Sequence, residues 1–290
     1  MVKSNLKEQK VIKKADLKVV DNNAVKTTAY SDINLKKWRE YDHIKTDTLW
    51  EFPNRLKGGH SNEYHGNYIP QIAQQIYERY TKKNDIVLDL FFGSGTSGIE
   101  AINMGRRCIG VELKDELAES VSEKFTPKQL VTDVNIICAD SASEIAKEKI
   151  KARLDIMGAK KAQLLMLHPP YDDIIKFSDK KEDLSNCATT EEFYDLFEKV
   201  AQNGYDLLEK GRFACLIIGD KYANSQHIPL GFECMARMNK LGFITKAIII
   251  KDMQGNERAK GKTANLWRYR ALAGGFYIFK HEYVMVFQKV

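Results

Sequence analysis

Short apolar runs alternate with helix-like segments along most of this chain. The apolar runs predict seven strands, at 86–92, 108–113, 134–140, 163–168, 212–220, 243–250 and 281–289. Apolar residues spaced three and four apart predict helices, at 69–80, 97–105, 114–125, 141–153, 191–211 and 229–242. Repeated strand–helix–strand units are typical of a parallel sheet with helices on both faces.

The connection before the last strand has a different composition. Residues 251–280 are rich in glycine and cations and show no helical period, so we predict a loop there. Without a crossover helix, the last strand should run antiparallel to its neighbours. We therefore predict an α/β fold with one domain over 46–290, preceded by a basic, partly ordered arm over 1–45.

Composition narrows the class of protein only modestly. The chain has 290 residues, with 45 Lys and Arg against 39 Asp and Glu, a net charge of +6 that is compatible with nucleic acid without establishing it. No apolar run approaches the roughly 18 residues of a membrane span, and the start has no secretory pattern. Five separated cysteines without a Cys-x-x-Cys pair predict no metal site, no disulfides and a cytoplasmic location.

A glycine-rich turn follows the first predicted strand, from Asp89 to Thr96. Such a turn brings the backbone close to a ligand at the carboxyl edge of the sheet, although a plain tight turn has the same composition. Glu112 ends the next strand and is placed to accept hydrogen bonds from ribose hydroxyls. Asp140 ends the third strand and could accept from an adenine amino group. Together these acids predict a nucleoside-binding site.

A second motif, His168-Pro169-Pro170-Tyr171, ends the fourth predicted strand. Two prolines stop a strand and hold the chain stiff, with carbonyls free to accept hydrogen bonds. A rigid carbonyl with a polar neighbour can accept from an exocyclic amino group, and an aromatic ring can stack on the base that carries it. Alone, the motif could be a simple strand-ending turn.

These two motifs together resemble the S-adenosylmethionine-dependent amino-methyltransferases of DNA, which modify adenine N6 or cytosine N4. The similarity covers roughly 60–290, including 65–70, the segment 105–112 and the final strand from 281. It implies a Rossmann-like methyltransferase fold, a seven-stranded, mostly parallel sheet with a reversed last strand. It also implies S-adenosylmethionine as the cofactor, bound by these residues: Asn67, Tyr68, Asp89, Phe91, Gly93, Ser94, Gly95, Thr96, Glu112 and Asp140.

The resemblance implies that the tetrapeptide is catalytic, with His168 and the Pro169 carbonyl accepting from the target amine and Tyr171 stacking on a flipped base. The family usually has Asp, Asn or Ser where this chain has His168, and in many members the tetrapeptide precedes the cofactor motif. Neutral imidazole can still accept a hydrogen bond. The residue type that separates adenine from cytosine enzymes is absent here, and we expect adenine N6 as the target. If neutral His168 is the acceptor, activity should fall as pH drops through the histidine pKa, near about 6.5 if that pKa is unshifted.

The sixth predicted strand should end at the cofactor edge, so that its continuation overhangs the site. Cations interleaved with aromatics suit phosphates and unstacked bases. The predicted nucleic-acid contacts are Phe177, Lys221, Arg258, Lys260, Lys262, Trp267, Arg268 and Arg270. We expect DNA as the partner. Since little of the chain is left to read sequence, we expect a short target, weak specificity, or help from a second subunit in a homodimer or from a partner subunit. An RNA methyltransferase, a protein-glutamine methyltransferase and a non-catalytic nucleic-acid-binding subunit remain alternatives.

Overall fold

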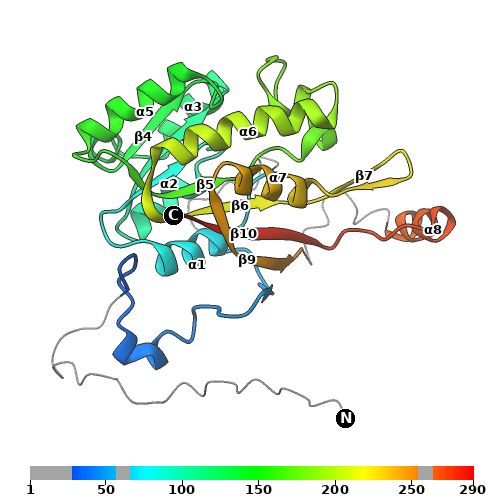
Figure 1. Ribbon diagram of the computed structural model, residues 1–290, viewed down its shortest axis with the longest axis horizontal. Helices are drawn as coiled ribbons and strands as arrows, with labels where there is room; N and C mark the ends of the chain where they lie inside the picture. The colour runs from blue at the N-terminus through cyan, green and yellow to red at the C-terminus, as the bar shows by residue number, and fades with distance from the viewer. Residues whose placement is uncertain (1–27, 57–65, 254–263) are drawn as a thin grey trace, which may run out of the picture.

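The computed structural model describes residues 28–56, 66–253 and 264–290. Its main sheet has eight strands in the order β1-β9-β10-β6-β5-β2-β3-β4 (Figure 1). The strands are β1 (Leu49–Trp50), β2 (Ile86–Asp89), β3 (Arg107–Glu112), β4 (Val134–Cys138), β5 (Ala162–Leu167), β6 (Leu208–Ile218), β9 (Phe243–Asp252) and β10 (His281–Lys289). All neighbouring pairs are parallel except those of β10, which is antiparallel to both β9 and β6. The predicted parallel sheet with a reversed last strand is confirmed.

Helices cover both faces of this sheet. They are α1 (Pro70–Tyr80), α2 (Thr96–Asn103), α3 (Asp115–Ser122), α4 (Pro127–Thr132), α5 (Glu144–Ile156), α6 (Thr190–Leu207), α7 (Leu230–Lys240) and α8 (Ala264–Gly274). Short 3-10 helices are η1 (Leu35–Glu40), η2 (Asp172–Ile174) and η3 (Leu184–Asn186). In Figure 1, α6 and α7 lie above the sheet and α1 lies below it.

Side chains on alternate positions of the central strands pack into two hydrophobic cores, one on each face of the sheet. Ile86 and Leu88 of β2 belong to the core that contains Phe193 and Phe197 of α6. Val87, between them, belongs to the other core, with Ile72 of α1. This period of two on a strand buried on both faces explains the continuous apolar runs in the sequence.

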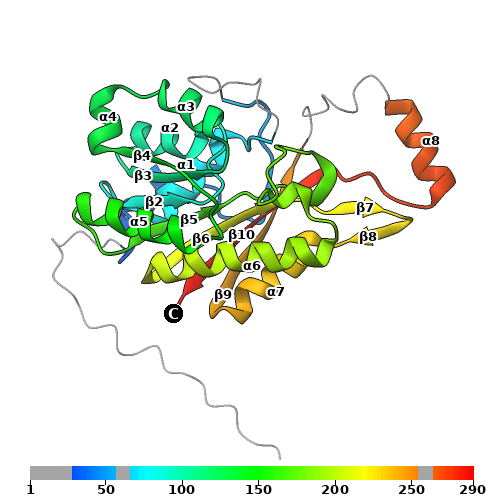
Figure 2. The same cartoon turned by 90° about the horizontal axis from the view of Figure 1, so that it is seen from above.

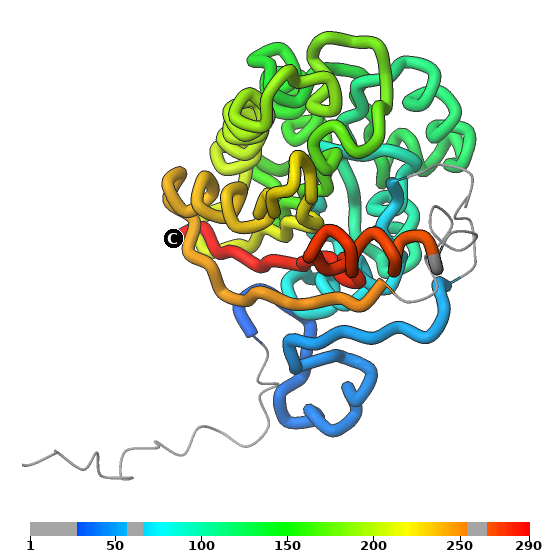
Figure 3. Tube along the Cα trace, turned by 90° about the vertical axis from the view of Figure 1, so that its right-hand side faces the viewer, coloured from blue at the N-terminus to red at the C-terminus, as the bar shows by residue number. Residues whose placement is uncertain are grey.

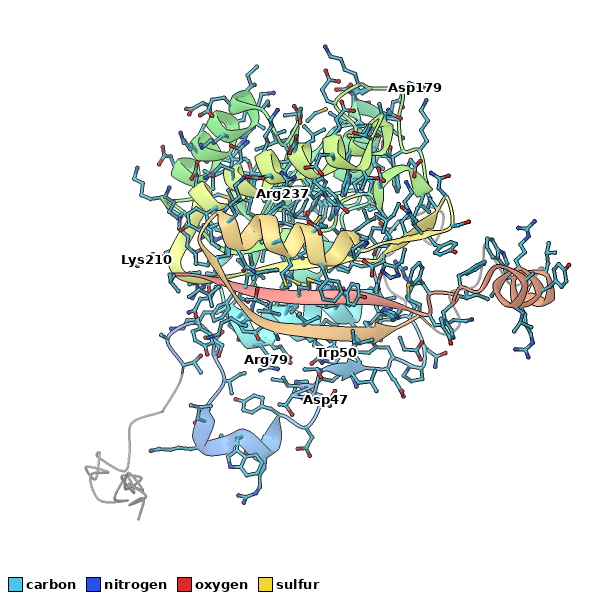
Figure 4. All side chains as sticks on the ribbon, turned by 45° about the vertical axis from the view of Figure 1, so that its right-hand side comes forward. Asp47, Trp50, Arg79, Asp179, Lys210 and Arg237 are labelled. Carbon is cyan, nitrogen blue, oxygen red and sulfur yellow. The ribbon has the colours of Figure 1, made fainter. Side chains whose placement is uncertain are left out.

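The eighth strand is the first departure from the sequence prediction, which gave seven. Leu49 and Trp50 pair in parallel with Ile250 and Lys251 at the end of β9. Trp50, labelled in Figure 4, is only 1% exposed. A two-residue strand carries no readable alternation, so its pairing depends on this buried indole rather than on local pattern.

Part of the predicted arm is packed against the domain. Tyr30 lies with its ring 4.7 Å from that of Phe213, and the Lys45 backbone N–H donates to Gln75 of α1 over 2.7 Å. The tube in Figure 3 shows residues 28–56 running along the β9 side of the sheet. Residues 1–27 of the predicted arm lie outside the described residues.

The predicted loop over 251–280 contains a helix, α8, so that prediction is wrong at 264–274. Large apolar side chains of this helix, such as Leu266 and Leu272, stay exposed, which explains why no helical period is visible in the sequence. A hairpin of β7 (Lys221–Ala223) and β8 (Gln226–Ile228) was also not predicted. Figure 2 shows α8 and this hairpin projecting from the same end of the sheet. Within the described residues, no helix combines the length and apolar character that a bilayer span requires.

Candidate active site

A cavity of about 300 Å³ lies at the carboxyl ends of the parallel strands. Both predicted motifs line it, although β2 and β5 bring them from distant parts of the sequence. The sequence-predicted residues in its wall are Asn67, Tyr68, Phe91, Gly93, Thr96, Glu112, Asp140, His168, Pro169, Pro170, Tyr171 and Phe177. The fold therefore joins the predicted cofactor and catalytic residues in one cavity.

Asp89 lies behind the glycine-rich turn rather than in the cavity wall. Its carboxylate accepts from the Phe91 backbone N–H over 2.9 Å and from the Ser97 hydroxyl. The Ser97 hydroxyl also lies 2.5 Å from that of Tyr68. Burial raises the pKa of Asp89 to about 6, because an apolar surrounding disfavours its charge. Through these hydrogen bonds Asp89 stabilises the conformation of the turn.

The turn itself depends on glycine at two positions. Gly93 and Gly95 have positive φ angles of 50° and 83°. A Cβ atom on Gly95 would also come within 2.7 Å of Val121 of α3. The Gly93 N–H donates to the Glu112 carboxylate over 2.9 Å, which couples the turn to the end of β3. Glycine thus allows the positive φ angles of this turn, and Gly93 brings the backbone into the cavity wall.

Glu112 and Asp140 keep acceptor capacity on the cavity side. Glu112 accepts two backbone N–H groups, from Gly93 and Lys114, both over 2.9 Å. A carboxylate has about four lone-pair positions, so about two remain for hydroxyl donors. Burial raises the Glu112 pKa. Asp140 accepts from the Ala142 N–H over 2.9 Å through one oxygen, and its other oxygen has no hydrogen bond among the described residues.

The start of α2 carries an unsatisfied hydroxyl. Thr96 Oγ1 is buried, and it finds no hydrogen-bond partner among the described residues. A buried polar atom in a cavity wall costs free energy unless a ligand or water satisfies it. In the glycine-rich turn before α2, the Ser94 hydroxyl donates to Asn67 Oδ1 over 2.6 Å. This hydrogen bond ties the segment before α1 to the turn. Ser94 and Gly95 lie beside the cavity and outside its wall.

The tetrapeptide follows β5, and its Tyr171 ring packs against Gly219, the residue just after β6. A Cβ atom on Gly219 would lie 2.9 Å from the Tyr171 ring, so glycine allows this ring its position. The Tyr171 hydroxyl donates to Glu282 Oε2 over 2.9 Å, and His168 Nε2 lies 3.3 Å from the same hydroxyl. The other oxygen of Glu282 pairs with Lys251 Nζ at 2.9 Å.

His168 is neutral at physiological pH. Burial lowers its pKa to about 4; the nearby Glu282 opposes this shift, and the Lys251 ammonium adds to it. The value of about 6.5 expected for an unshifted imidazole therefore does not apply to this buried ring. The neutral ring keeps one nitrogen able to accept a hydrogen bond throughout the physiological range.

Sequence reasoning missed Lys251 and Glu282. They are directly paired across β9 and β10, and their residues are 4% and 6% exposed. A usable signal exists, since Lys251 directly follows the apolar run 247–250 and Glu282 directly precedes the apolar run 283–287. Charges are almost never buried this deeply without a partner.

The predicted nucleic-acid contacts are dispersed. Trp267, Arg268 and Arg270 lie on α8, with the Arg270 guanidinium 5.3 Å from the centre of the Trp267 ring. Phe177 is in the cavity wall, against Gly66. Lys221 pairs with Asp172 at 2.9 Å and with Asp173, so its charge is used within the protein. The remaining candidates, Arg258, Lys260 and Lys262, lie outside the described residues.

No group of three or more His, Cys, Asp or Glu in the described part of the chain has a geometry suited to a metal ion. The described cysteines are all free thiols.

Comparisons with known proteins bear on this site. A family model described as DNA methylase, of the N6/N4 methyltransferase type, matches residues 3–123 and 162–290. The probable type III restriction-modification enzyme HindVI Mod subunit of Haemophilus influenzae is 33% identical over 100 residues, 33% of this chain and 13% of that protein. The type II methyltransferase M.MjaII of Methanocaldococcus jannaschii is 32% identical over 84 residues, 27% of this chain and 16% of that protein.

The matched segments thus span less than a fifth of the length of these two relatives. Among solved structures, TrmN from Thermus thermophilus has a TM-score of 0.49 and 15% identity, covering 78% of this chain and 50% of that one. The family model covers most of the chain and includes both motifs of the cavity, which confirms the resemblance predicted from them. This chain belongs to the N6/N4 DNA methylase family.

Proposed function

We propose that this protein transfers a methyl group from S-adenosylmethionine to the exocyclic amino nitrogen of a DNA base, with adenine N6 as the target. The observation that carries the proposal is the single cavity shared by the glycine-rich turn and the tetrapeptide. The carboxylates of Glu112 and Asp140 can accept hydrogen bonds from a nucleoside. The Pro-Pro carbonyl and the neutral imidazole of the tetrapeptide can accept hydrogen bonds from an amino group.

Family membership makes S-adenosylmethionine the cofactor, and the residues present fit it. Glu112 has lone pairs left for the ribose hydroxyls, and Asp140 has a free oxygen for an adenine amino group. The orphaned Thr96 hydroxyl and the segment at Asn67 and Tyr68 lie in the same wall. When bound, the cofactor supplies a methyl group already activated on a sulfonium.

The protein's own contribution is to align and polarise the amine. His168 and the Pro169 carbonyl accept hydrogen bonds from the two N–H groups of the amine. These hydrogen bonds localise the nitrogen lone pair that the aromatic ring would otherwise share. With its lone pair localised in this way, the amino nitrogen would be the nucleophile toward the methyl group that the bound cofactor would supply. The electrons of the S–C bond would stay on the cofactor, and one amino proton would leave to solvent. Positioning supplies much of the rate enhancement, because both reactants are held together in one cavity.

A base inside a duplex reaches this cavity only by flipping out, at a cost of a few kcal/mol. Ile174 and Ile175, just after the tetrapeptide, line the cavity and are 51% and 43% exposed. With Phe177 they form an apolar rim around the opening. Such a rim suits an unstacked base, with the Tyr171 ring as the stacking partner inside.

We place the DNA backbone along α8. Lys251 and Met253, at the carboxyl end of β9, line the cavity. The helix α8 is the next described element after β9 in the chain, and it exposes Arg268, Tyr269 and Arg270. Phe276, two residues after α8 ends, stacks on Tyr222 of β7 with ring centres 4.6 Å apart, which ties the segment after α8 to the hairpin.

Replacing both Arg268 and Arg270 with Gln should weaken DNA binding and flatten its salt dependence. Each phosphate that an arginine no longer neutralises reduces the slope of log K against log salt by about 0.9, so a decrease of about 1.8 is expected. Fluorescence anisotropy with a short duplex from low to moderate salt measures this slope. Lys210→Gln is the matched control, since this exposed lysine lies far from α8 at the start of β6 (Figure 4). An unchanged slope in the double variant would remove α8 from the interface.

The contribution of His168 to methylation should be constant between about pH 5.5 and 8, and it should be lost only as pH approaches about 4. The sign follows from the lowered pKa, because protonation removes the acceptor only below it. Initial rates at saturating cofactor and DNA measure the profile. His168→Asn is the control: it should lack the decline near pH 4, while Asp89, with a pKa of about 6, titrates in both proteins. A wild-type decline near the unperturbed histidine pKa of about 6.5 that His168→Asn lacks would contradict this assignment.

The proposed activity is tested with labelled S-adenosylmethionine and unmethylated duplex DNA, single-stranded DNA or RNA, followed by digestion to nucleosides. Label in N6-methyladenine supports the proposal in full. Label in N4-methylcytosine keeps the reaction and corrects the base. Label only in RNA would show that RNA, rather than DNA, is the substrate. Dependence on an added partner subunit would show that recognition is shared.

A further inference from the structure

A buried chain of polar groups extends behind the tetrapeptide. It runs from Lys251 Nζ to Glu282 Oε1 (2.9 Å), from Glu282 Oε2 to the Tyr171 hydroxyl (2.9 Å), and from that hydroxyl to His168 Nε2 (3.3 Å). Lys251 lies on β9, Glu282 lies on β10, and the tetrapeptide follows β5, so the whole sheet edge is needed to assemble the chain.

The direction of the protons in this chain follows from its members. The Lys251 ammonium can only donate, and its charge stabilises the carboxylate of Glu282, which can only accept. The Tyr171 hydroxyl has one proton, and the charged carboxylate is a stronger acceptor than a neutral imidazole. Tyr171 therefore donates to Glu282. Its oxygen is then left to accept, and the hydrogen bond from His168 requires a proton on Nε2.

A neutral imidazole carries one N–H and one acceptor nitrogen. With the proton on Nε2, the lone pair must be on Nδ1, which has no hydrogen-bond partner in the described ranges. The opposite tautomer would present an N–H to the target amine, donor against donor. The identity of the protonated nitrogen thus decides whether His168 can replace the Asp, Asn or Ser usual at this position.

We propose that Lys251, Glu282 and the Tyr171 hydroxyl act as positioning groups that fix the Nε2-protonated tautomer of His168 and so present Nδ1 as the acceptor for the target amino group. This inference rests on the proposed function of the site. It assigns the Tyr171 hydroxyl a task separate from stacking by its ring, and it gives the buried ion pair a role in specificity for an amine.

The first test reads the tautomer directly, without DNA or cofactor. Long-range ¹H–¹⁵N spectra of the full chain labelled at histidine nitrogens distinguish the protonated nitrogen from the bare one, and His168→Asn assigns the signals. Wild type should show Nε2 protonated. Tyr171→Phe should shift His168 toward a mixture or toward the other tautomer. Tyr80→Phe is the matched control, because this tyrosine packs on Phe213 at the far edge and should leave His168 unchanged.

A second variant guards against misfolding of Tyr171→Phe. In Lys251→Met/Glu282→Leu the tyrosine loses its acceptor, and its hydroxyl is free to donate to Nε2, so the proton should move to Nδ1. Wild-type protein protonated on Nδ1, or an unchanged tautomer in either folded variant, would overturn the proposal. These readings do not depend on activity, so the absence of methyl transfer would sink the proposed function while leaving the tautomer measured.

The kinetic test compares wild type with the variant His168→Asn. The asparagine side chain is an amide, whose oxygen is always the acceptor, so it has no tautomers like those of histidine. Tyr171→Phe should lower kcat by at least about tenfold when residue 168 is His, because a wrong tautomer disables the imidazole. The same change made on top of His168→Asn should cost less than about threefold, with KM for DNA little altered in either case. Equal losses in the two backgrounds would contradict the proposal and leave Tyr171 with a purely structural role.

Discussion

Replacing His168 with Ala is expected to lower kcat for DNA methylation by about 100- to 1,000-fold, corresponding to about 2.7–4 kcal/mol of transition-state stabilisation. The side chain lies in the cavity wall beside Pro169, and its neutral form can accept from the target amine. In the Ala variant this acceptor is missing while the Pro169 carbonyl remains. Single-turnover kinetics with labelled cofactor and a short duplex measure the chemical step.

The loss should be confined to catalysis. His168 is not among the residues that hold the glycine-rich turn, so the dissociation constant for S-adenosylmethionine should change less than about twofold. His168→Asn should recover much of the rate, because an amide oxygen can take over the hydrogen bond. A rate for His168→Ala within about threefold of wild type would mean that the Pro169 carbonyl alone polarises the amine.

The sheet was predictable because its strands are buried on both faces. Runs such as those ending at Asp89 and Leu167 are too short and too apolar for surface helices, and the helical segments between them fix a parallel order. β1 and α8 were not predictable in the same way. The two-residue β1 forms only against the finished edge of β9, and α8 has no buried stripe to impose a period.

The candidate site was predictable where residue type and strand end coincide. Glu112 and the His168 tetrapeptide follow this rule, since they lie at strand ends that a parallel sheet must bring together. The residues that contact these side chains in the folded protein could not be identified from the sequence. Nothing near Asp89 in the sequence marks Ser97 as its donor, and the separation of Lys251 from Glu282 conceals their contact. Burial also moved the pKa of His168, which composition cannot foretell.

Replacing Lys251 with Met is expected to destabilise the fold by about 3–5 kcal/mol, the cost of leaving a buried carboxylate without its partner. Both residues are nearly inaccessible, and their charged atoms are 2.9 Å apart. The free energy of unfolding, from urea titrations of wild type and variant, measures the loss. Lys246→Met is the control, because this lysine is also on β9 but exposed, and it should change stability by less than about 0.5 kcal/mol.

The double variant Lys251→Met/Glu282→Leu separates stability from function. Because replacing both partners removes the unpaired charge, we expect it to recover most of the lost stability. Activity should not recover with it, since Tyr171 would still lack the carboxylate that orients its hydroxyl. A double variant as stable as wild type and equally active would show that the ion pair serves only the fold. A stable but slow one would show that a pair which contributes little net stability is retained to orient the active site.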